Sequence, residues 1–145
     1  MEFKASRRVM VDMSATILHH GHIRLLKKAS EMGTVVVALC TDDEVLKWKG
    51  YTPEISFLHR KEIIASIRYV SEVVPSPWLV NLDFIDAHGI DYLVHGDDNP
   101  NPIPQERMII FPRTPGISSC DVRERMLGLN NAWKKPNPSS HVTGK

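Results

Sequence analysis

Two histidines flank a glycine at the point where an apolar run gives way to a predicted helix, and these residue types can bind a phosphate. The residues ILHHGH at 17–22 precede apolar residues that recur every three positions, which predicts a helix that starts near Gly21. The first amide groups of such a helix have no partner in the chain, and the macrodipole makes that end positive. His19 and His22 are three positions apart, so both imidazoles can reach one anion, and Gly21 lets the backbone approach it.

The same residues admit two other interpretations. Histidines near a helix start are often caps or surface residues, and a bare H-x-G-H pattern also occurs by chance. A zinc site is the second alternative, although two histidines form no closed site unless His20 or a distant residue adds a ligand. These residues alone leave all three interpretations open.

More cations follow other predicted strands. Lys47 and Lys49 come after the second strand, and the residues RTPGISS at 113–119 come after the fifth. Arg113 can hold an anion through a bidentate fork, and the two serines open a second helix whose amino end can hold phosphate. Each feature alone fits a solvated loop, but their repetition at strand ends favours a polyanion site.

Apolar runs that alternate with helical spacing predict the elements that position these side chains. Strands that alternate with helices in this way imply right-handed βαβ units, an α/β fold and a mainly parallel sheet, with ligands beyond the carboxyl ends of the strands. The expected strands are 8–11, 34–39, 72–74, 92–94 and 108–111, and the expected helices are 21–32, 58–69, 79–88 and one that begins at 118–119.

Composition predicts two loops and a tail. The segment 46–57 has lysines, glycine and proline without an apolar period, which predicts a mobile flap. The segment 96–106 contains three prolines and is predicted to be a loop at a strand end. Because the chain turns polar near its end, we expect one domain over 1–130 and a flexible polar tail over 131–145.

Length and charge limit the classes of protein that remain. At 145 residues, with 42% hydrophobic and 24% charged residues, the sequence fits one globular domain. A formal net charge of +1 gives no general attraction to nucleic acid or membrane, and no apolar run suits a membrane span or signal peptide. Cys40 and Cys120 have no C-x-x-C spacing, which indicates reduced thiols. We therefore expect a cytoplasmic protein without nucleic-acid or membrane partners.

Four motifs, in order along the chain, resemble those of the cytidylyltransferases. They are HHGH at 19–22, RYVSEVV at 68–74, HGDD at 95–98 and RTPGISS at 113–119. The resemblance implies a Rossmann-like nucleotidyltransferase fold, with helices on both faces of a five-stranded sheet. It also implies an enzyme that transfers CMP from CTP to a phosphorylated alcohol or a phosphonate and releases pyrophosphate.

The resemblance further implies roles for individual residues. The motif histidines would steady the triphosphate and the α-phosphoryl group, and the segment 113–119 would hold the β- and γ-phosphates. The implied catalytic residues are His19, His22, Lys49 and Arg113; the nucleotide-binding residues are Ser14, Ala15, Gly21, Asp97, Asp98, Thr114, Ile117, Ser118 and Ser119; the acceptor-binding residues are Lys47, Arg60, Asp12 and Trp78.

A cofactor and a homodimer are implied as well. Mg²⁺ would be bridged by the phosphates of CTP, because the motifs offer few carboxylates for a protein cage. The segment 68–74 lies at a dimer interface in the family, which implies a homodimer through Arg68–Val74.

The residues just before the histidines depart from the family pattern. The family has Gly-Thr-Phe-Asp there, whereas this chain has DMSAT at 12–16 and so lacks both the aromatic and the acidic residue. The form VDMS at 11–14, together with HGDD, resembles cytidylyltransferases that act on phosphonates such as 2-aminoethylphosphonate. The acceptor stays open between such a phosphonate and a phosphorylated alcohol such as glycerol 3-phosphate. An adenylyltransferase on the same fold and a catalytically idle nucleotide-binding homologue stay open too.

Overall fold

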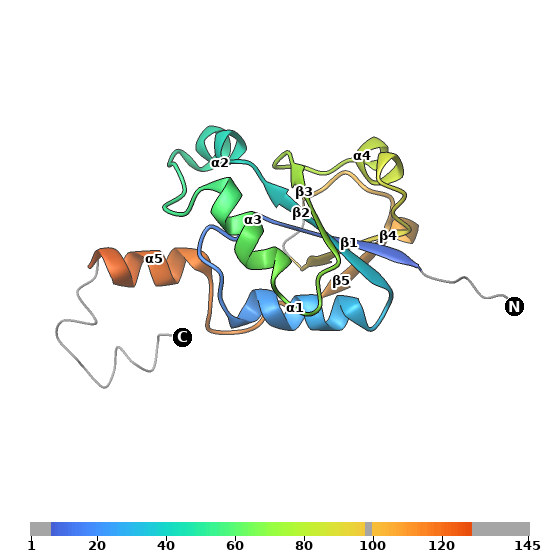
Figure 1. The fold of residues 1–145 in the computed structure, drawn as a ribbon, viewed down its shortest axis with the longest axis horizontal. Coiled ribbons are helices and arrows are strands. Elements are labelled where there is room, and N and C mark those ends of the chain that lie inside the picture. The colour runs from blue at the N-terminus through green and yellow to red at the C-terminus, as the bar shows by residue number, and fades with distance from the viewer. Residues whose placement is uncertain (1–6, 98–99, 129–145) are drawn as a thin grey trace, which may run out of the picture.

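The computed structural model describes residues 7–97 and 100–128, which form one parallel sheet and the helices around it (Figure 1). The tail predicted for 131–145 and the predicted site residue Asp98 lie outside this part of the chain. The strands are β1 (Arg8–Met13), β2 (Thr34–Cys40), β3 (Glu72–Ser76), β4 (Tyr92–Gly96) and β5 (Met108–Phe111). The helices are α1 (His20–Ser30), α2 (Asp42–Lys49), α3 (Phe57–Ala65), α4 (Leu82–Ala87) and α5 (Ser119–Leu127), with a 3₁₀ turn η1 (Gln105–Arg107) before β5.

The five strands pair in the order β3-β2-β1-β4-β5, and every pairing is parallel. β1 lies at the centre, where Met10 pairs with Val36 on one side and Leu93 on the other. A central parallel strand is covered on both faces, which explains why the strands read as continuous apolar runs instead of alternating ones. The predicted α/β fold and its five strands are confirmed.

Helices cover both faces of the sheet because successive strand residues point to opposite sides. Val9 belongs to one core cluster with Leu26 of α1 and Ile64 of α3. Met10, the next residue, belongs to a second cluster with Ile85 of α4. All five side chains are at most 1% exposed, so the sheet separates two dry half-cores.

Two helices are shorter than predicted. The helix expected over 58–69 ends at Ala65, where the Ser66 amide donates to carbonyls of the last turn and its hydroxyl donates to the Glu62 carbonyl (2.9 Å). The helix expected over 79–88 begins only after Asn81, whose side chain accepts the Phe84 amide (2.9 Å). In both cases a local side-chain hydrogen bond sets the helix boundary, at the end of α3 and at the start of α4, within an otherwise apolar stretch.

The mobile loop predicted from residue 46 is wrong at its start, because α2 continues to Lys49. The Thr41 hydroxyl caps the helix by accepting the Glu44 amide (3.3 Å), and Gly50 ends it in the left-handed conformation at φ 83°. Only Val45 of α2 is buried. A short helix with one buried side chain shows no apolar period, so the sequence pattern could not reveal it.

The sheet has a topological switch point beside β1, since the chain leaves β1 toward β2 and returns on its other side as β4. In open parallel sheets, ligands bind at such a point beyond the carboxyl ends of the strands. α5 extends beyond this edge, next to the start of α1 (Figure 1). Within 7–97 and 100–128, no helix is long and apolar enough to cross a membrane.

Candidate active site

A pocket of about 330 Å³ lies at the carboxyl ends of the strands. It is formed by the end of β1, the start of α1, the end of α2 and the segment that leads from β5 into α5. The structure therefore brings together predicted residues that are far apart in the sequence. Those that line the pocket are Asp12, Ser14, His19, Gly21, His22, Lys49, Trp78, Arg113, Thr114, Ile117, Ser118 and Ser119.

The first turn of α1 is capped by the motif histidines themselves. The Gly21 amide donates to His19 Nδ1, and the His19 amide donates to His22 Nδ1, each at 3.1 Å. The prediction that these amides lack partners in the chain is therefore wrong for Gly21, and also for His22, whose amide donates to the His19 carbonyl at 3.1 Å. Because each Nδ1 accepts a hydrogen bond, a neutral ring must carry its proton on Nε2. An anion at this helix start would therefore meet imidazole N–H groups in place of these bonded backbone amides.

Burial keeps these two rings neutral. Desolvation lowers the pKa of His22 from 6.5 to about 3, with a further lowering from nearby His19 and an opposing effect of a hydrogen bond with the His19 backbone. The pKa of His19 is also lowered, first by burial and then by the charges of His20 and Arg113. The two ring centroids are 4.0 Å apart. The pair thus presents two hydrogen-bond donors side by side at neutral pH without the repulsion of two imidazolium ions.

The start of α5 forms the opposite wall. Ser118 caps the helix by accepting the Asp121 amide (3.0 Å), as the sequence predicts. The Ser119 hydroxyl donates to the Ile17 carbonyl (2.7 Å), so it can only accept from another group. This bond fixes α5 to the loop between β1 and α1 and places the two helix starts at one cavity.

Cations dominate the charge of the pocket. Its described lining residues include Arg24, Lys28, Lys49 and Arg113 against a single carboxylate, Asp12. Arg24 and Lys28 were missed by sequence reasoning. The signal for Lys28 was available, because it follows Gly21 by seven positions and Arg24 by four, spacings that keep residues on one side of a helix.

A smaller cavity of about 250 Å³ adjoins the pocket and shares Asp12, Ser14, Trp78 and His95 with it. The buried Asp12 carboxylate pairs with His95 Nδ1 and accepts the Asn101 side-chain amide at 2.8 Å. Asn101 Oδ1 in turn accepts a backbone amide, that of Val80, at 2.6 Å. This chain of hydrogen bonds holds one carboxylate rigidly at the boundary between the cavities. Sequence reasoning missed His95 and Asn101 as parts of the site.

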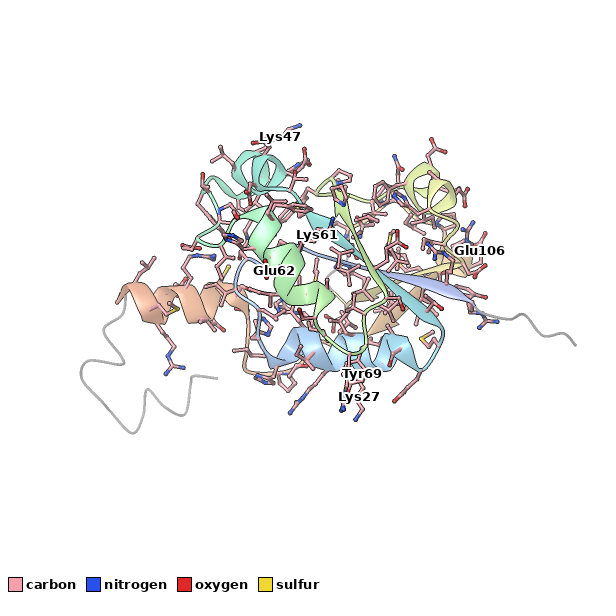
Figure 2. The ribbon with its side chains drawn as sticks, in the orientation of Figure 1. Lys27, Lys47, Lys61, Glu62, Tyr69 and Glu106 are labelled. Atoms are coloured by element: carbon pink, nitrogen blue, oxygen red, sulfur yellow. The ribbon has the colours of Figure 1, made fainter. Side chains whose placement is uncertain are left out.

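Four predicted site residues lie elsewhere among the described residues. Lys47 points away from the body of the molecule on the outer side of α2 (Figure 2), and Asp97 is exposed outside the pocket lining. Ala15 is 3% exposed in the core and adopts a left-handed conformation, φ 44°, in the turn before the histidines. Arg60 is 2% exposed, buried under the site.

Arg60 supports the pocket from below. Its guanidinium donates to the Ser14 carbonyl (2.6 Å), the Ile55 carbonyl (3.0 Å) and Asp42 Oδ1 (2.7 Å). In this arrangement its donors point to the protein and not to the cavity. Arg60 therefore ties together the loop after β1, the start of α2 and the segment before α3.

No cluster of three or more His, Cys, Asp or Glu side chains that could hold a metal ion occurs in the described ranges. Cys40 is buried with its pKa raised to about 12, chiefly by desolvation, and Cys120 is exposed at the pocket.

A parallel sheet with its switch point at a cation-lined pocket, between two helix starts, defines the class of Rossmann-like nucleotidyltransferases. Residues 14–125 match the model of the family described as cytidylyltransferase-like. The chain belongs to this family of enzymes, as the sequence motifs predict.

Relatives support this assignment. The chain is 35% identical over 128 residues to glycerol-3-phosphate cytidylyltransferase of Bacillus subtilis (strain 168), covering 85% of this chain and 99% of that relative. It is 32% identical to ethanolamine-phosphate cytidylyltransferase of Mus musculus, covering 86% of this chain and 34% of the longer mouse protein. The solved structure of a lipopolysaccharide core biosynthesis protein from Thermoplasma volcanium GSS1 has the same fold, with a TM-score of 0.64 over 76% of this chain and 99% of the other, at 18% identity.

Proposed function

We propose that this protein transfers CMP from CTP to a small acceptor that carries a phosphate or phosphonate and an amino group, and releases pyrophosphate. One observation carries the proposal: a cation-lined pocket with paired imidazole donors opens into a smaller cavity bounded by a rigid carboxylate and an indole ring. The pocket has the chemistry for a triphosphate, and the cavity has the chemistry for a short cationic acceptor. The relatives are cytidylyltransferases by name, which supports the choice of CTP as the nucleotide.

In this mechanism an acceptor oxygen attacks the α-phosphorus of CTP in line. A bond forms between that oxygen and the α-phosphorus, and the bond from the α-phosphorus to the bridging oxygen of the β-phosphate breaks with its electron pair. The acceptor is already ionised at neutral pH, so the reaction needs no general base. The protein contributes positioning and charge neutralisation.

His19 and His22 would donate their Nε2 hydrogens to the α-phosphoryl oxygens, where negative charge is concentrated in the transition state. Arg113 and the start of α5 would hold the β- and γ-phosphates, and Lys49 would face the acceptor. Neutral imidazoles suit this role because burial has already lowered their pKa values, so each ring keeps its Nε2–H and stays uncharged near neutral pH.

Mg²⁺ is proposed as the cofactor, bound through the phosphates. The described pocket lining offers one carboxylate among four Lys and Arg cations, so oxygen ligands for the ion would come mainly from CTP. When bound, the ion would neutralise charge on the triphosphate.

The acceptor cavity favours an ammonium group over a hydroxyl. Asp12 supplies a buried carboxylate, and the face of Trp78 can attract a cation. Trp78 is itself stacked on Trp48, with ring centroids 6.4 Å apart. Together with the resemblance of residues 11–14 to phosphonate enzymes, these features favour an acceptor like 2-aminoethylphosphonate.

A pyrophosphate-release assay with Mg²⁺ tests the proposal. CTP is supplied with glycerol 3-phosphate, phosphoethanolamine, phosphocholine, 2-aminoethylphosphonate or 2-hydroxyethylphosphonate, and ATP replaces CTP in parallel. We expect release with CTP, and a higher kcat/KM for the amino-bearing acceptors than for their hydroxyl counterparts. Release with ATP alone would make the protein an adenylyltransferase, and no release with any pair would make it an idle homologue.

Variants of the site sharpen the same assay. His22→Ala should lower turnover roughly 10²-fold, as loss of one donor to transition-state charge does, and unchanged turnover would show that the motif is structural. Asp12→Asn should raise KM for 2-aminoethylphosphonate more than KM for 2-hydroxyethylphosphonate, because only the first acceptor carries a charge for the carboxylate to attract.

We also propose a homodimer through Arg68–Val74. Arg68 and Tyr69 line an open surface hollow near the amino ends of β1 and β2, and the Arg68 guanidinium donates to the Tyr69 hydroxyl at 3.2 Å. Light scattering after gel filtration should give twice the chain mass, and Tyr69→Glu should give the monomer. A monomeric parent protein at tens of micromolar would exclude this interface.

A further inference from the structure

Arg123 on α5 makes a set of contacts that the proposed mechanism does not use. Its side chain is 12% exposed. The guanidinium donates to both carboxylate oxygens of Glu54, at 2.8 Å from Nη2 and 3.1 Å from Nε. It also donates to the Tyr51 hydroxyl and to Thr16 Oγ1, each at 3.0 Å, and its central carbon lies 4.3 Å from the centroid of the Tyr51 ring. The five donors of a guanidinium point in fixed directions and can hold three partners in place at once, whereas the three donors of a lysine all project from one nitrogen.

The partners of Arg123 belong to the wall of the pocket. Thr16 and Tyr51 both line it, and Thr16 is 1% exposed. Tyr51 follows Lys49 by two residues, with only Gly50 between them. Because Gly50 ends α2 at φ 83° and has no side chain to hold it, the direction in which the chain leaves Lys49 depends on how Tyr51 is anchored.

The start of the same helix lies at the predicted phosphate site. α5 begins at Ser119, one residue after its cap Ser118, and the Ser119 hydroxyl is bonded to Ile17. Arg123 stands one helical turn further along. α5 is thus fixed to the loop after β1 at both turns, and one short rigid element joins the triphosphate half of the pocket to the segment behind Lys49.

We propose that Arg123 is a positioning residue for the transfer reaction, and that it holds Lys49 toward the acceptor by anchoring Tyr51 and Glu54 to α5. When the phosphates of CTP bind at the start of α5, this link also fixes the position of Lys49. CTP therefore places Lys49 for binding of the acceptor. The effect on the transfer reaction rests on the proposed function. The anchoring of Tyr51 and Glu54 by Arg123 does not depend on that function.

The charges of Arg123 and Glu54 favour the contact between α5 and the segment after α2. The hydrogen bonds from Arg123 lower the pKa of the Glu54 carboxyl, and Glu54 raises the pKa of Arg123. Glu54 is itself 53% exposed, so this ion pair is screened by solvent and salt. The hydroxyl contacts with Thr16 and Tyr51 are better shielded and should carry most of the positioning.

Arg123→Lys tests the link, with Arg125→Lys as the matched control, because Arg125 is an exposed arginine on the same helix. Trypsin cleavage after Lys49 is followed by mass spectrometry in the full chain, with and without CTP. We expect cleavage roughly fivefold faster in Arg123→Lys than in Arg125→Lys, and protection by CTP that is clear in the control and weak in Arg123→Lys. Equal cleavage in the two variants would overturn the proposal, whatever reaction the protein performs.

Kinetics then separate positioning from general stability. For Arg123→Lys, KM for the acceptor should rise about tenfold while Kd for CTP and the melting temperature stay near the parent values. Tyr51→Phe, which removes only the hydroxyl, should raise acceptor KM less and should add little in the double variant with Arg123→Lys. A lower melting temperature with unchanged acceptor KM would assign Arg123 a purely structural role. If the parent protein transfers nothing, the proposed function fails and the cleavage comparison alone decides the link.

Discussion

Mild acid should destabilise this protein through His22, whose buried ring stays neutral in the folded state. In the unfolded chain His22 has its ordinary pKa of 6.5, and in the folded protein burial lowers that pKa to about 3. As the pH falls, the unfolded state therefore binds the proton first. The free energy of unfolding decreases from about pH 6.5 downward and stops changing below about pH 3.

The loss in free energy of unfolding follows from the lowered pKa of His22. Each pH unit between the two pKa values costs about 1.4 kcal/mol, so the roughly 1.5 units from 6.5 down to pH 5.0 remove about 2 kcal/mol. Above pH 6.5 this ring contributes almost no pH dependence. The lowered pKa of His19 adds a loss of the same sign. A loss of about 2 kcal/mol is a large share of the stability of a domain of this size.

Urea unfolding at pH 7.5 and pH 5.0, followed by far-ultraviolet circular dichroism, measures the loss. His22→Gln removes the titrating ring but keeps an acceptor for the His19 amide, as glutamine does at this position of a capping box. The variant should lose about 2 kcal/mol less than the parent between the two pH values. His20→Gln, at an exposed position of the same turn, controls for the loss of one imidazole. An equal acid loss in His22→Gln and the parent would refute the reasoning.

Three further outcomes are expected. Gly21→Ala places a Cβ 2.8 Å from Cε1 of His19, so the ring must move; turnover should fall about 10²-fold with little change in melting temperature, and full activity would show that the ring position is unimportant. Arg60→Met should lower the free energy of unfolding by about 2–4 kcal/mol in urea titrations, because it removes the ion partner of Asp42 and the donors to the Ser14 and Ile55 carbonyls; a change below about 1 kcal/mol would contradict this. Asn101→Leu should cost about 1–3 kcal/mol by the same measurement, since the Asp12 carboxylate loses a buried donor, and a neutral substitution would mean that water replaces the amide.

The sequence predicted correctly the features that depend on residues close together in the chain, such as strands and a helix cap. The strands are recognisable because both faces of a parallel sheet are buried, so each strand is an apolar run of its own. The segments 19–22 and 113–119 were predicted as phosphate sites because small residues, histidines and serines recur at strand ends, and the structure places both at one pocket. The start of α5 at its serine cap depends on residues only three apart, and it is confirmed.

Prediction failed where a contact joins distant parts of the chain. α2 was missed because only Val45 faces the core. The hydrogen bond between Asp12 and His95 spans 83 positions, and the one between Thr16 and Arg123 spans 107. A periodic pattern in the sequence cannot predict such contacts. They form only because the order of the strands in the sheet brings distant segments together.

The sequence by itself determined the α/β class, the order of the strands along the chain, the family and the residue types available for phosphate binding. Tertiary structure decided which of those residues meet at the pocket. It directs Lys47 outward (Figure 2), buries Arg60 beneath the site and bonds the Gly21 amide of α1 to the His19 ring. The physical reason is that residue type sets what a side chain can bind, whereas packing and hydrogen bonds across the fold set where its donors and acceptors point.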